Sequence, residues 1–306
     1  MFGSRKFSPD ADIPDLSGRV IFITGGNSGL GRETALQLAK HKPSTIYITS
    51  RNVEKGRETI ANINSAVPGA SIVLLQLDLA SLSSVRDAAS KFLNQSSRLD
   101  VLFNNGGIMS VPPALTSDGY EIQFGTNHIG HALLTRLLLP TLLKTAEKPE
   151  TDVRIVTLGS SAHTLSPKGG IVFETLRTSQ VDLGKVALYG QSKLANMLYS
   201  SELACRYPSI TAVTVHPGQV SETGLSRSMR ESHLIVRVFE ATIGKVIGVS
   251  VEQGALNQLW AATSGEVESG VYYDPIGKKA AGSTVSRDRR LAQRLWEWTE
   301  EQLNSQ

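Results

Sequence analysis

Arg19-Val-Ile-Phe-Ile-Thr24 is a short apolar run rich in β-branched residues, and Gly25-Gly-Asn-Ser-Gly-Leu-Gly31 follows it directly. This stretch predicts a strand, a glycine turn and then a helix over residues 32–40. Glycines let the backbone turn sharply and approach a ligand, and the free N–H groups at the start of a helix attract a pyrophosphate. The stretch therefore indicates a dinucleotide site, although its Gly-x-x-x-Gly-x-Gly spacing differs from the more familiar Gly-x-Gly-x-x-Gly.

Strands and helices are expected to alternate along the rest of the chain. Apolar runs predict further strands over residues 45–50, 72–77, 99–103, 153–158, 212–215 and 271–273. Helical patterns are found at 53–65, 120–139 and 251–262. Such alternation is typical of a doubly wound α/β fold, in which helices cover both faces of a mostly parallel sheet. We predict a Rossmann fold in which residues 1–306 form one domain, with residues 1–17 as a polar N-terminal arm.

Composition and charge exclude several classes of protein. Lys and Arg number 31 against 28 Asp and Glu, and the charges are interspersed, so no nucleic-acid partner is expected. Residues 1–17 mix charges with prolines, which predicts neither a signal core nor an integral membrane segment. Cys205 is the only cysteine, which excludes an internal disulfide and a multi-cysteine metal site. We expect a cytoplasmic protein in which Cys205, Trp296 and Trp298 are packing residues.

The end of the second strand bears on the choice of cofactor. In Rossmann proteins an acidic residue about 20 positions past the glycines binds the ribose 2′-OH of NAD. This chain has Ser50 and Arg51 there, so no carboxylate repels a 2′-phosphate and a guanidinium can bind one. Arg32, beside the last glycine, is a second candidate. We predict NADP as the cofactor; the alternative is that Arg51 is a solvated loop residue.

Two further strand ends carry candidate cofactor contacts. Asp78 follows the strand over 72–77, where a short polar side chain suits a hydrogen bond to an adenine amino group. It suits capping of a helix from Ser81 almost as well, and both interpretations stay open. Asn104-Asn-Gly-Gly107 follows the strand over 99–103. Its small and amide residues let the backbone approach a cofactor and tie neighbouring strands together.

Candidate catalytic side chains lie further along. Ser160 follows the strand over 153–158 and could bind a carbonyl oxygen. In Tyr189-Gly-Gln-Ser-Lys193 the tyrosine and lysine share one face of a helix, so an ammonium can lie beside a phenol. That charge stabilises the phenolate and lowers the pKa of the tyrosine toward that of a general acid/base. Taken alone, the spacing fits any amphipathic helix with a half-buried tyrosine and a solvated lysine.

The helix expected over 120–139 carries Asn127, with His128 and His131 close by. Two histidines three positions apart invite a metal interpretation, but no carboxylate or third ligand accompanies them at a suitable spacing. We predict ordinary polar positions in a helix for both histidines, and no metal site.

Jointly and in order, these motifs resemble those of the short-chain dehydrogenase/reductase family. The matching pieces are residues 24–31, Asp78, residues 104–107, Asn127, Ser160, Tyr189, Lys193 and Pro217-Gly218. Ala187-Leu-Tyr-Gly-Gln-Ser-Lys-Leu-Ala-Asn196 and Gly159-Ser-Ser-Ala-His163 are similar to retinol-dehydrogenase-like members. The sequence departs from the family at two places. Gly106 stands where the family usually has alanine, and Thr223 lies one place later than the family's threonine, which puts its contact with the nicotinamide amide in doubt.

The resemblance implies a role for each catalytic candidate. Tyr189 would transfer a proton to or from the substrate oxygen, and Ser160 would hydrogen-bond that oxygen. Lys193 would lower the tyrosine pKa and hold the nicotinamide ribose, and Asn127 would position a water linking the lysine to solvent. The expected cofactor contacts are Gly25, Asn27, Ser28, Gly29, Leu30, Gly31, Arg32, Arg51, Asp78, Asn104, Gly106, Tyr189, Lys193, Pro217, Gly218 and Val220.

Residues 221–250 lie where such proteins place a substrate lid. Apolar side chains dominate this segment, which favours an apolar substrate or a helix that dips into a membrane surface over 228–249. A plain packing helix that covers the pocket is the alternative. The insert over 164–186, between Ser160 and Tyr189, is expected to loop out over the surface near the pocket rim.

We therefore expect an NADP-dependent oxidoreductase acting on an apolar ketone, aldehyde or secondary alcohol of the steroid, retinoid or polyketide type. The alternative is a nucleotide-sensing protein that binds NADP without turnover. An intact set of Ser160, Tyr189 and Lys193 favours the enzyme. The substrate, the direction of reaction and the formation of a homodimer stay open.

Overall fold

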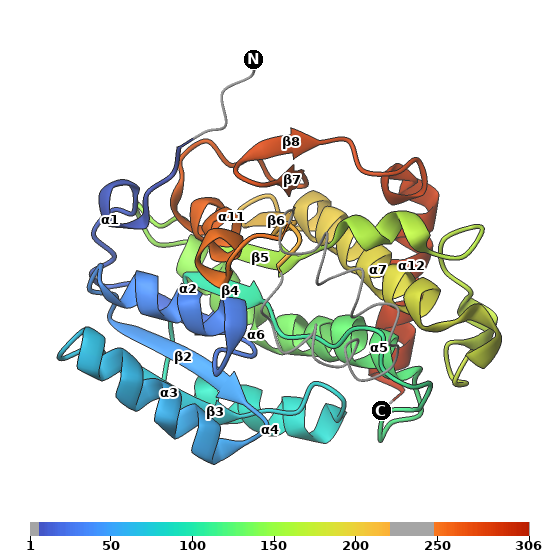
Figure 1. The fold of residues 1–306 in the computed structure, drawn as a ribbon, viewed down its shortest axis with the longest axis horizontal. Helices are drawn as coiled ribbons and strands as arrows, with labels where there is room; N and C mark the ends of the chain where they lie inside the picture. The colour runs from blue at the N-terminus through green and yellow to red at the C-terminus, as the bar shows by residue number, and fades with distance from the viewer. Residues whose placement is uncertain (1–5, 221–247, 306) are drawn as a thin grey trace.

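One eight-stranded sheet runs through the computed structural model, which describes residues 6–220 and 248–305. The strand order is β3-β2-β1-β4-β5-β6-β7-β8, and neighbours run parallel except β7 and β8 (Figure 1). The strands are β1 (Val20–Ile23), β2 (Thr45–Ser50), β3 (Ile72–Gln76), β4 (Val101–Asn104), β5 (Arg154–Leu158), β6 (Thr211–Val215), β7 (Tyr272–Asp274) and β8 (Lys278–Ala280). The predicted doubly wound fold is confirmed, and β8 adds an edge strand that the sequence does not predict.

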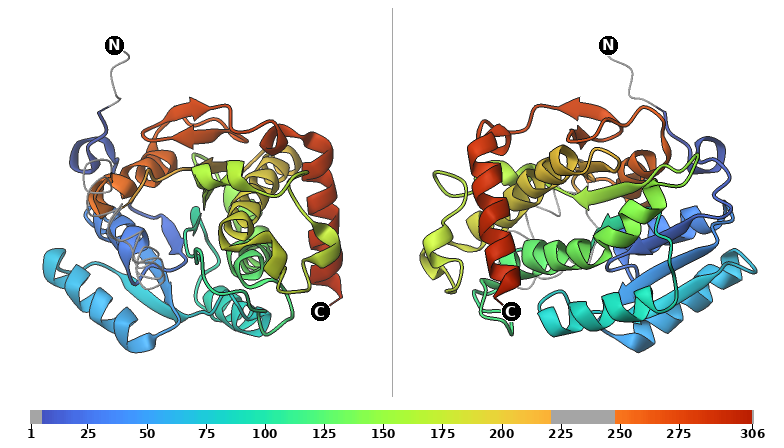
Figure 2. Two further views of the ribbon diagram at one scale, coloured as in Figure 1. Left: turned by 45° about the vertical axis from the view of Figure 1, so that its right-hand side comes forward. Right: turned by 180° about the vertical axis from the view of Figure 1, so that it is seen from behind.

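Helices cover both faces of this sheet (Figure 2). One face carries α2 (Gly29–Ala39), α3 (Val53–Ala66) and α11 (Val251–Thr263). The other carries α4 (Leu82–Leu93), α6 (Gly130–Ala146) and α7 (Lys185–Arg206), with α12 (Arg289–Asn304) packed on α7. Along β1, Phe22 belongs to the core under α4, α6 and α7, whereas Ile21 and Ile23 belong to the core under α2 and α11. The strand is apolar on both faces because helices cover both.

Shorter helical segments connect these elements. They are α1 (Pro9–Asp12), α5 (Ile122–Phe124), the π-helical turn η1 (Gly125–Ile129), and the 3₁₀ turns η2 (Ser161–Leu165), η3 (Phe173–Thr175), η4 (Val181–Leu183) and η6 (Val285–Arg287). The single helix predicted over 120–139 is therefore three consecutive segments, in which the π-helical turn η1 separates the α-helical segments α5 and α6.

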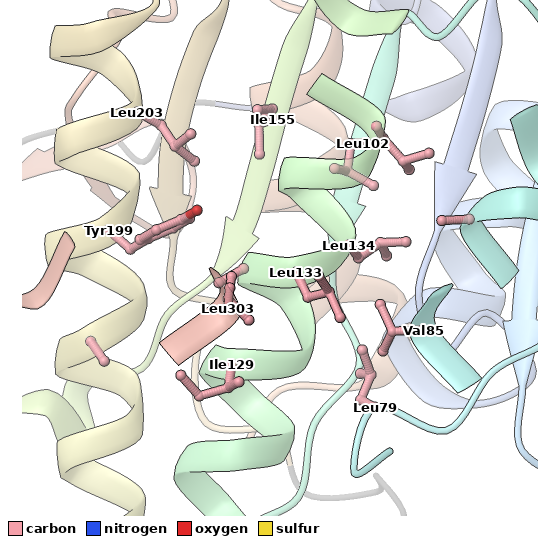
Figure 3. Close-up of a cluster of buried hydrophobic side chains, with 14 of the residues drawn as sticks. Leu79, Val85, Leu102, Ile129, Leu133, Leu134, Ile155, Tyr199, Leu203 and Leu303 are labelled. Carbon is pink, nitrogen blue, oxygen red and sulfur yellow. The ribbon is translucent and has the colours of Figure 1, made fainter. Parts of the chain in front are cut away.

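The core beneath α6 and α7 joins distant parts of the chain. Figure 3 shows Leu134 of α6, Tyr199 of α7 and Leu303 of α12 gathered near Leu102 of β4 and Ile155 of β5. All five are buried. Burial of one such side chain contributes about 1.5–3 kcal/mol to folding. The C-terminal helix is thus part of the fold that holds α7, and α7 carries two of the predicted catalytic residues.

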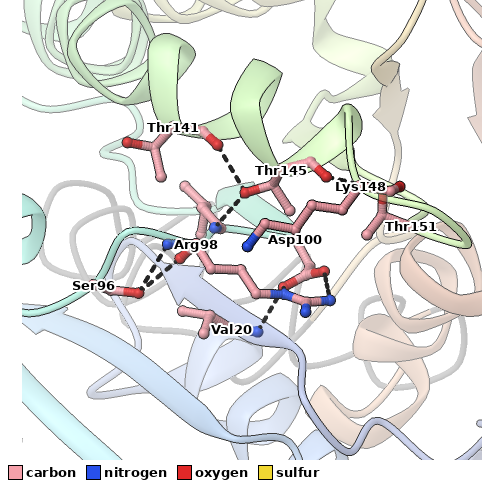
Figure 4. A network of polar contacts seen from close by, with 9 residues as sticks. Val20, Ser96, Arg98, Asp100, Thr141, Thr145, Lys148 and Thr151 are labelled. Carbon is pink, nitrogen blue, oxygen red and sulfur yellow. Dashed lines mark hydrogen bonds and ion pairs between the residues drawn. The ribbon is translucent and has the colours of Figure 1, made fainter.

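A polar network fixes the amino ends of β1 and β4 (Figure 4). Asp100 is 1% exposed, and its Oδ2 accepts hydrogen bonds from the Val20 N–H at 2.8 Å and from Arg98 Nε at 2.8 Å. Its Oδ1 accepts from Arg98 Nη2 at 2.7 Å, and Thr145 Oγ1 of α6 accepts from the Leu99 N–H at 3.1 Å. The buried carboxylate is fully paired. It holds the strands together at the end of the sheet opposite their carboxyl ends.

The insert over 164–186 packs more deeply than the sequence predicts. Ile171, Phe173 and Leu176 are buried in the core shared with α7 and α12. The ring of Phe173 lies 6.0 Å from the Trp298 ring, and the guanidinium carbon of Arg294 lies 4.2 Å from the Phe173 ring centroid. The prediction that the whole insert loops out over the surface is wrong, because α12 supplies a packing partner from the far end of the chain.

The predicted packing residues differ in their environments. Trp296 is 9% exposed and stacks on Tyr199 with ring centroids 4.8 Å apart, and the Trp298 ring lies 5.9 Å from the Phe124 ring. Packing is therefore confirmed for both tryptophans. Cys205 is exposed, so the same prediction is wrong for the cysteine. It lies near the end of α7, where Arg289 Nη2 at the start of α12 donates a hydrogen bond to its Sγ at 3.5 Å.

Residues 221–247 lie outside the described residues. They include most of the predicted lid over 221–250 and also Thr223. They also include most of the membrane-contact segment over 228–249. On either side of the gap, Val220 pairs with Val249, and Ser250 caps α11 by accepting a hydrogen bond from the Gln253 N–H. Within 6–220 and 248–305, no helix is long and apolar enough to cross a membrane.

Candidate active site

A cleft with a volume of about 750 Å³ lies at the carboxyl ends of β1 to β5. The predicted cofactor residues that line it are Gly25, Asn27, Ser28, Gly29, Leu30, Gly31, Arg32, Arg51, Asp78 and Gly106. Strand order reverses between β1 and β4, because β2 and β3 lie on one side of β1 and β4 to β6 on the other. In such sheets ligands bind beyond the strand ends at this reversal. The cleft is therefore located where a dinucleotide is expected.

The glycine turn has the shape of a phosphate cradle. Gly25 and Gly29 have φ values of +63° and +49°, a region that side chains disfavour. A Cβ at Gly31 would lie 2.5 Å from the Gly25 carbonyl oxygen, so only glycine fits there. Ser28 precedes α2 without a capping hydrogen bond from its side chain. The start of α2 is thus available to bind an anion such as a pyrophosphate, and the turn fits the predicted nucleotide.

Thr24 ties this turn to the loop after β4. Its Oγ1 accepts hydrogen bonds from the Asn105 N–H at 2.9 Å and the Gly106 N–H at 2.8 Å. Asn105 Nδ2 in turn donates to the Thr24 carbonyl oxygen at 2.7 Å. Asn105 lines the cleft, whereas Asn104 is buried and its Nδ2 donates to Thr135 Oγ1 of α6 at 3.1 Å. The structure therefore directs the second asparagine of the motif, and not the first, toward the cleft.

Asp78 lines the cleft at the end of β3. Its Oδ1 accepts a hydrogen bond from the Ala80 N–H at 3.0 Å. The residue that caps α4 is Ser81, whose side chain accepts from the Ser84 N–H. Of the two interpretations of Asp78, the capping role is wrong, because Ser81 already fills it. The adenine contact stays a prediction.

Three cations face the outer end of the cleft. Arg51, at the end of β2, and Arg32, in α2, are both exposed and line the cleft, and so does Lys55 in the first turn of α3. Lys55 was not among the predicted cofactor residues, although its place four positions after Arg51 was a usable signal. Within 6–220 and 248–305, no carboxylate forms an ion pair with Arg51. As far as the described residues go, its guanidinium has no carboxylate partner and can bind an anion.

Three of the four predicted catalytic side chains, Ser160, Tyr189 and Lys193, come together at the end of β5. Tyr189 and Lys193 lie in α7 and are 8% and 5% exposed. Lys193 Nζ donates a hydrogen bond to the Leu158 carbonyl oxygen at 2.8 Å and lies 5.8 Å from the Tyr189 ring centroid. A side-chain hydrogen bond joins Tyr189 to Ser160. Leu158 lines the cleft, and Lys193 is hydrogen-bonded to it, but the described lining includes none of Ser160, Tyr189 and Lys193.

Burial sets the protonation of this group. It raises the pKa of Tyr189 to about 12, and the hydrogen bond with Ser160 offsets only part of that rise. Burial also lowers the pKa of Lys193 to about 8. The expected lowering of the tyrosine pKa is therefore not found; the pKa is raised, because desolvation outweighs the hydrogen bond with Ser160. Near pH 7 the phenol is protonated and the ammonium charged.

Asn127 lies in the π-helical turn η1. Its Oδ1 accepts a hydrogen bond from the Ile108 N–H at 2.8 Å, and its Nδ2 donates to the Ile108 carbonyl oxygen and to Ser192 Oγ, both at 2.9 Å. The side chain thus joins the loop after β4 to α7, one residue before Lys193. Single π turns inside helices are frequent at functional sites. The water-holding role of Asn127 stays a prediction.

Pro217, Gly218 and Val220 follow β6, the strand next to β5. The described lining of the cleft ends at Leu158 of β5 and does not include these three residues. Asn257 Nδ2 of α11 holds the start of this loop by donating to the His216 carbonyl oxygen at 2.8 Å. Their predicted contact with the cofactor therefore stays a prediction. No group of three or more metal-binding side chains occurs in the described ranges.

Comparison with known proteins gives consistent matches. Residues 19–166 match the family model described as short chain dehydrogenase. An uncharacterised oxidoreductase of Schizosaccharomyces pombe is 41% identical over 275 residues, which cover 88% of this chain and 80% of that protein. Retinol dehydrogenase 12 of Mus musculus is 37% identical over 299 residues, which cover 96% of this chain and 88% of that protein.

A solved structure agrees with these relatives. An uncharacterised protein from Mycobacterium paratuberculosis has a TM-score of 0.74 and 33% sequence identity, with 95% of this chain and 96% of that chain covered. The likeness therefore extends over nearly the whole chain and is not confined to the cleft.

Proposed function

The chain belongs to the short-chain dehydrogenase/reductase family, in its retinol-dehydrogenase-like branch, and on this premise we propose that it is an NADP-dependent oxidoreductase acting on an apolar carbonyl compound or secondary alcohol. The observation that carries the proposal is the meeting of Ser160, Tyr189 and Lys193 beside Leu158, a residue that lines the cleft. A proton donor, a hydroxyl and a cation at one point are the groups that carbonyl reduction requires.

The protonation of these groups supports reduction at neutral pH. When bound, NADPH would supply the hydride to the carbonyl carbon and leave as NADP⁺. The substrate oxygen would accept a hydrogen bond from Ser160 and a proton from Tyr189, whose pKa of about 12 keeps the phenol in its donor form. Solvent would then return the proton to the phenolate. Lys193 stays charged below about pH 8 and stabilises that transient phenolate.

The outer end of the cleft supports NADP over NAD as the cofactor. Arg51, Arg32 and Lys55 bring three positive charges to the region beside the end of β2, where an NAD-binding protein would carry a carboxylate. Ser50 does not supply a ribose contact of that kind, because its Oγ donates to the Asn52 carbonyl oxygen at 2.6 Å. A 2′-phosphate complements this charge, and a ribose hydroxyl does not use it.

Arg51→Ala is expected to weaken the binding of NADPH far more than the binding of NADH. A partly exposed guanidinium paired with a phosphate contributes on the order of 1.5–3 kcal/mol, which corresponds to roughly ten- to a hundredfold in affinity. Arg32→Ala should show the same trend to a smaller degree, and the wild-type preference should shrink as salt is raised. The measurement is Kd for both nucleotides by fluorescence titration.

Arg57→Ala is the matched control for this titration. Arg57 is an exposed arginine of α3 that pairs with Glu54 and does not line the cleft, so its removal changes net charge equally. It should leave both Kd values close to those of the wild type. If Arg51→Ala lowered the affinity for NADPH and for NADH equally, Arg51 would be only a surface charge with no role at the 2′-phosphate. A wild-type preference for NADH would end the NADP assignment.

The substrate class is tested by a panel of carbonyl compounds. The likeness to retinol dehydrogenase 12 and the apolar residues of the 221–250 segment support an apolar substrate. With NADPH in excess, kcat/KM should be highest for apolar aldehydes and ketones, retinal and steroid ketones included, and lowest for sugars of matched reactivity. A preference for sugars would contradict the apolar class. NADPH binding without turnover of any compound would favour the nucleotide-sensing alternative.

A further inference from the structure

The ring of His131 is buried between the π-helical turn η1 and the loop after β4 that contains Asn105 and Gly106, here called the cofactor-facing loop. His131 lies at the start of α6 and is 3% exposed. Nδ1 lies 2.9 Å from the Asn127 carbonyl oxygen, and Nε2 lies 2.9 Å from Thr24 Oγ1. Both ring nitrogens therefore have partners. One partner, Thr24, holds the loop after β4, and the other, Asn127, lies in the π-helical turn η1.

Chemistry fixes the direction of each hydrogen bond. A carbonyl oxygen can only accept, so Nδ1 carries a proton and donates it to Asn127. Burial lowers the pKa of His131 to about 4, so the ring is neutral near pH 7 and Nε2 is a bare acceptor. Thr24 Oγ1 must then donate to Nε2. The other acceptor near that hydroxyl, the Phe103 carbonyl oxygen at 3.1 Å, already receives the Thr24 N–H.

The orientation of the Thr24 hydroxyl controls the loop after β4. With its proton directed at His131, the lone pairs of Oγ1 face the N–H groups of Asn105 and Gly106, at 2.9 Å and 2.8 Å. Asn105 and Gly106 both line the cleft. One continuous chain of hydrogen bonds thus runs from these amides through Thr24 and His131 to the Asn127 carbonyl oxygen.

The chain continues to the catalytic helix. The side chain of Asn127 binds both backbone groups of Ile108 and donates to Ser192 Oγ of α7. Ser192 precedes Lys193, whose Nζ is directed to the Leu158 carbonyl oxygen. His131 thus adds a second connection: it links Thr24, and through it the cofactor-facing loop, to the backbone of Asn127, whose side chain joins Ile108 to the helix that carries the lysine.

We propose that His131 is a positioning residue, which acts through Thr24 and Asn127 to hold the Asn105–Gly106 loop in register with the catalytic helix. The inference rests on the proposed function, since it assigns a role within the same site. In this proposal the two ring nitrogens have different roles. The bond from Nε2 orders the loop that receives the nucleotide, and the bond from Nδ1 orders the turn that faces Lys193.

His128 is the matched control for this proposal. It is 1% exposed, lies three positions before His131, and has a pKa that burial lowers to about 3. Its Nε2 lies 3.0 Å from Thr299 Oγ1 of α12, and its ring packs against Phe124 and Tyr199. Changes at His128 therefore disturb packing against α12 without altering the chain of bonds from Thr24 to Asn127.

Three substitutions test the hydrogen bonds of the two ring nitrogens separately. His131→Asn places an amide donor near the Nδ1 position only, His131→Gln places an amide oxygen acceptor near the Nε2 position only, and His131→Phe keeps the shape with neither. His131→Gln should keep the NADPH Kd of the wild type and slow hydride transfer roughly three- to tenfold. His131→Asn should weaken the binding of NADPH by a similar factor. Once saturated with NADPH, it should transfer hydride at close to the wild-type rate. His131→Phe should show both losses.

The same three substitutions at His128 should lower the Tm without changing the NADPH Kd or the rate of hydride transfer. If the His131 variants changed the NADPH Kd and the rate no more than the His128 variants of equal Tm, His131 would be structural only and the proposal would be overturned. Should His131→Phe fail to fold, the Asn and Gln variants decide between these outcomes.

Nitrogen NMR of the histidine rings gives a readout that does not depend on turnover. The His131 signals, assigned by their loss in His131→Asn, should show a neutral ring with its proton on Nδ1. A proton on Nε2, or titration near the ordinary histidine pKa, would overturn the proposal. If the wild type binds NADPH but transfers no hydride to any carbonyl, the proposed function fails, while the NADPH Kd values and the NMR signals still decide the role of His131.

Discussion

Tyr189→Phe is expected to slow hydride transfer by roughly a hundred- to ten-thousandfold, the contribution typical of a general acid. The substitution removes only the phenolic hydroxyl. The ring is 8% exposed and should stay in place, so the nucleotide should bind as before. Ser160 would keep its hydrogen bond from the Ala162 N–H and lose only its bond with the phenol. The expected result is therefore a large loss of kcat with NADPH Kd changed by no more than about twofold.

Single-turnover mixing of the NADPH complex with an apolar aldehyde measures this step directly. Tyr199→Phe is the matched control, because Tyr199 is a buried tyrosine of the same helix whose ring stacks on Trp296 away from the cleft. It should transfer hydride at the wild-type rate. Retention of most of the kcat in Tyr189→Phe would mean that another group is the acid.

Lys193→Met is expected to lose both hydride transfer and nucleotide affinity. The side chain is 5% exposed, and its ammonium is hydrogen-bonded to Leu158, which lines the cleft, so removal of the charge affects the phenolate and the ribose at once. We expect kcat to fall by roughly a hundredfold or more and NADPH to bind roughly tenfold more weakly. Methionine has a similar length and apolar stem, which keeps the packing of α7 largely intact.

The pH dependence adds an independent check on Lys193. Because burial lowers its pKa to about 8, the ammonium loses its proton as pH rises past that value, and the wild-type rate should fall there. Lys193→Met should lack this step, and the exposed Lys144→Met on α6 should retain it. Unchanged NADPH affinity in Lys193→Met would remove the ribose role and leave only the effect on the phenol.

Much of the fold follows from local pattern. Apolar runs rich in β-branched residues predict β1 to β6 within one or two residues, because a buried parallel strand is apolar on both faces. The insert over 164–186 could not be predicted in this way, since its burial depends on α12. The helical pattern over 120–139 likewise does not reveal the π-helical turn around Asn127, because one i→i+5 turn adds only a single residue to an otherwise α-helical run.

The site shows the same limit at the level of single groups. The spacing of Tyr189 and Lys193 correctly predicts that they share a helix face, but the sign of the tyrosine pKa shift depends on burial, which spacing does not report. The sequence predicts ordinary polar positions in a helix for both His128 and His131. Its contact with Thr24 joins residues 107 positions apart in sequence, so only the folded chain distinguishes it from His128.

The central claim is that this chain moves a hydride from NADPH to a carbonyl carbon, with Tyr189 as the proton donor. The most direct measurement uses NADPH that carries deuterium at the transferable position of the nicotinamide, an apolar aldehyde or ketone from the panel, and mass spectrometry of the alcohol product. We predict one deuterium on the carbinol carbon with the wild-type protein and almost none with Tyr189→Phe over the same time. An absence of deuterated alcohol for every carbonyl tested, with NADPH bound, would contradict the account.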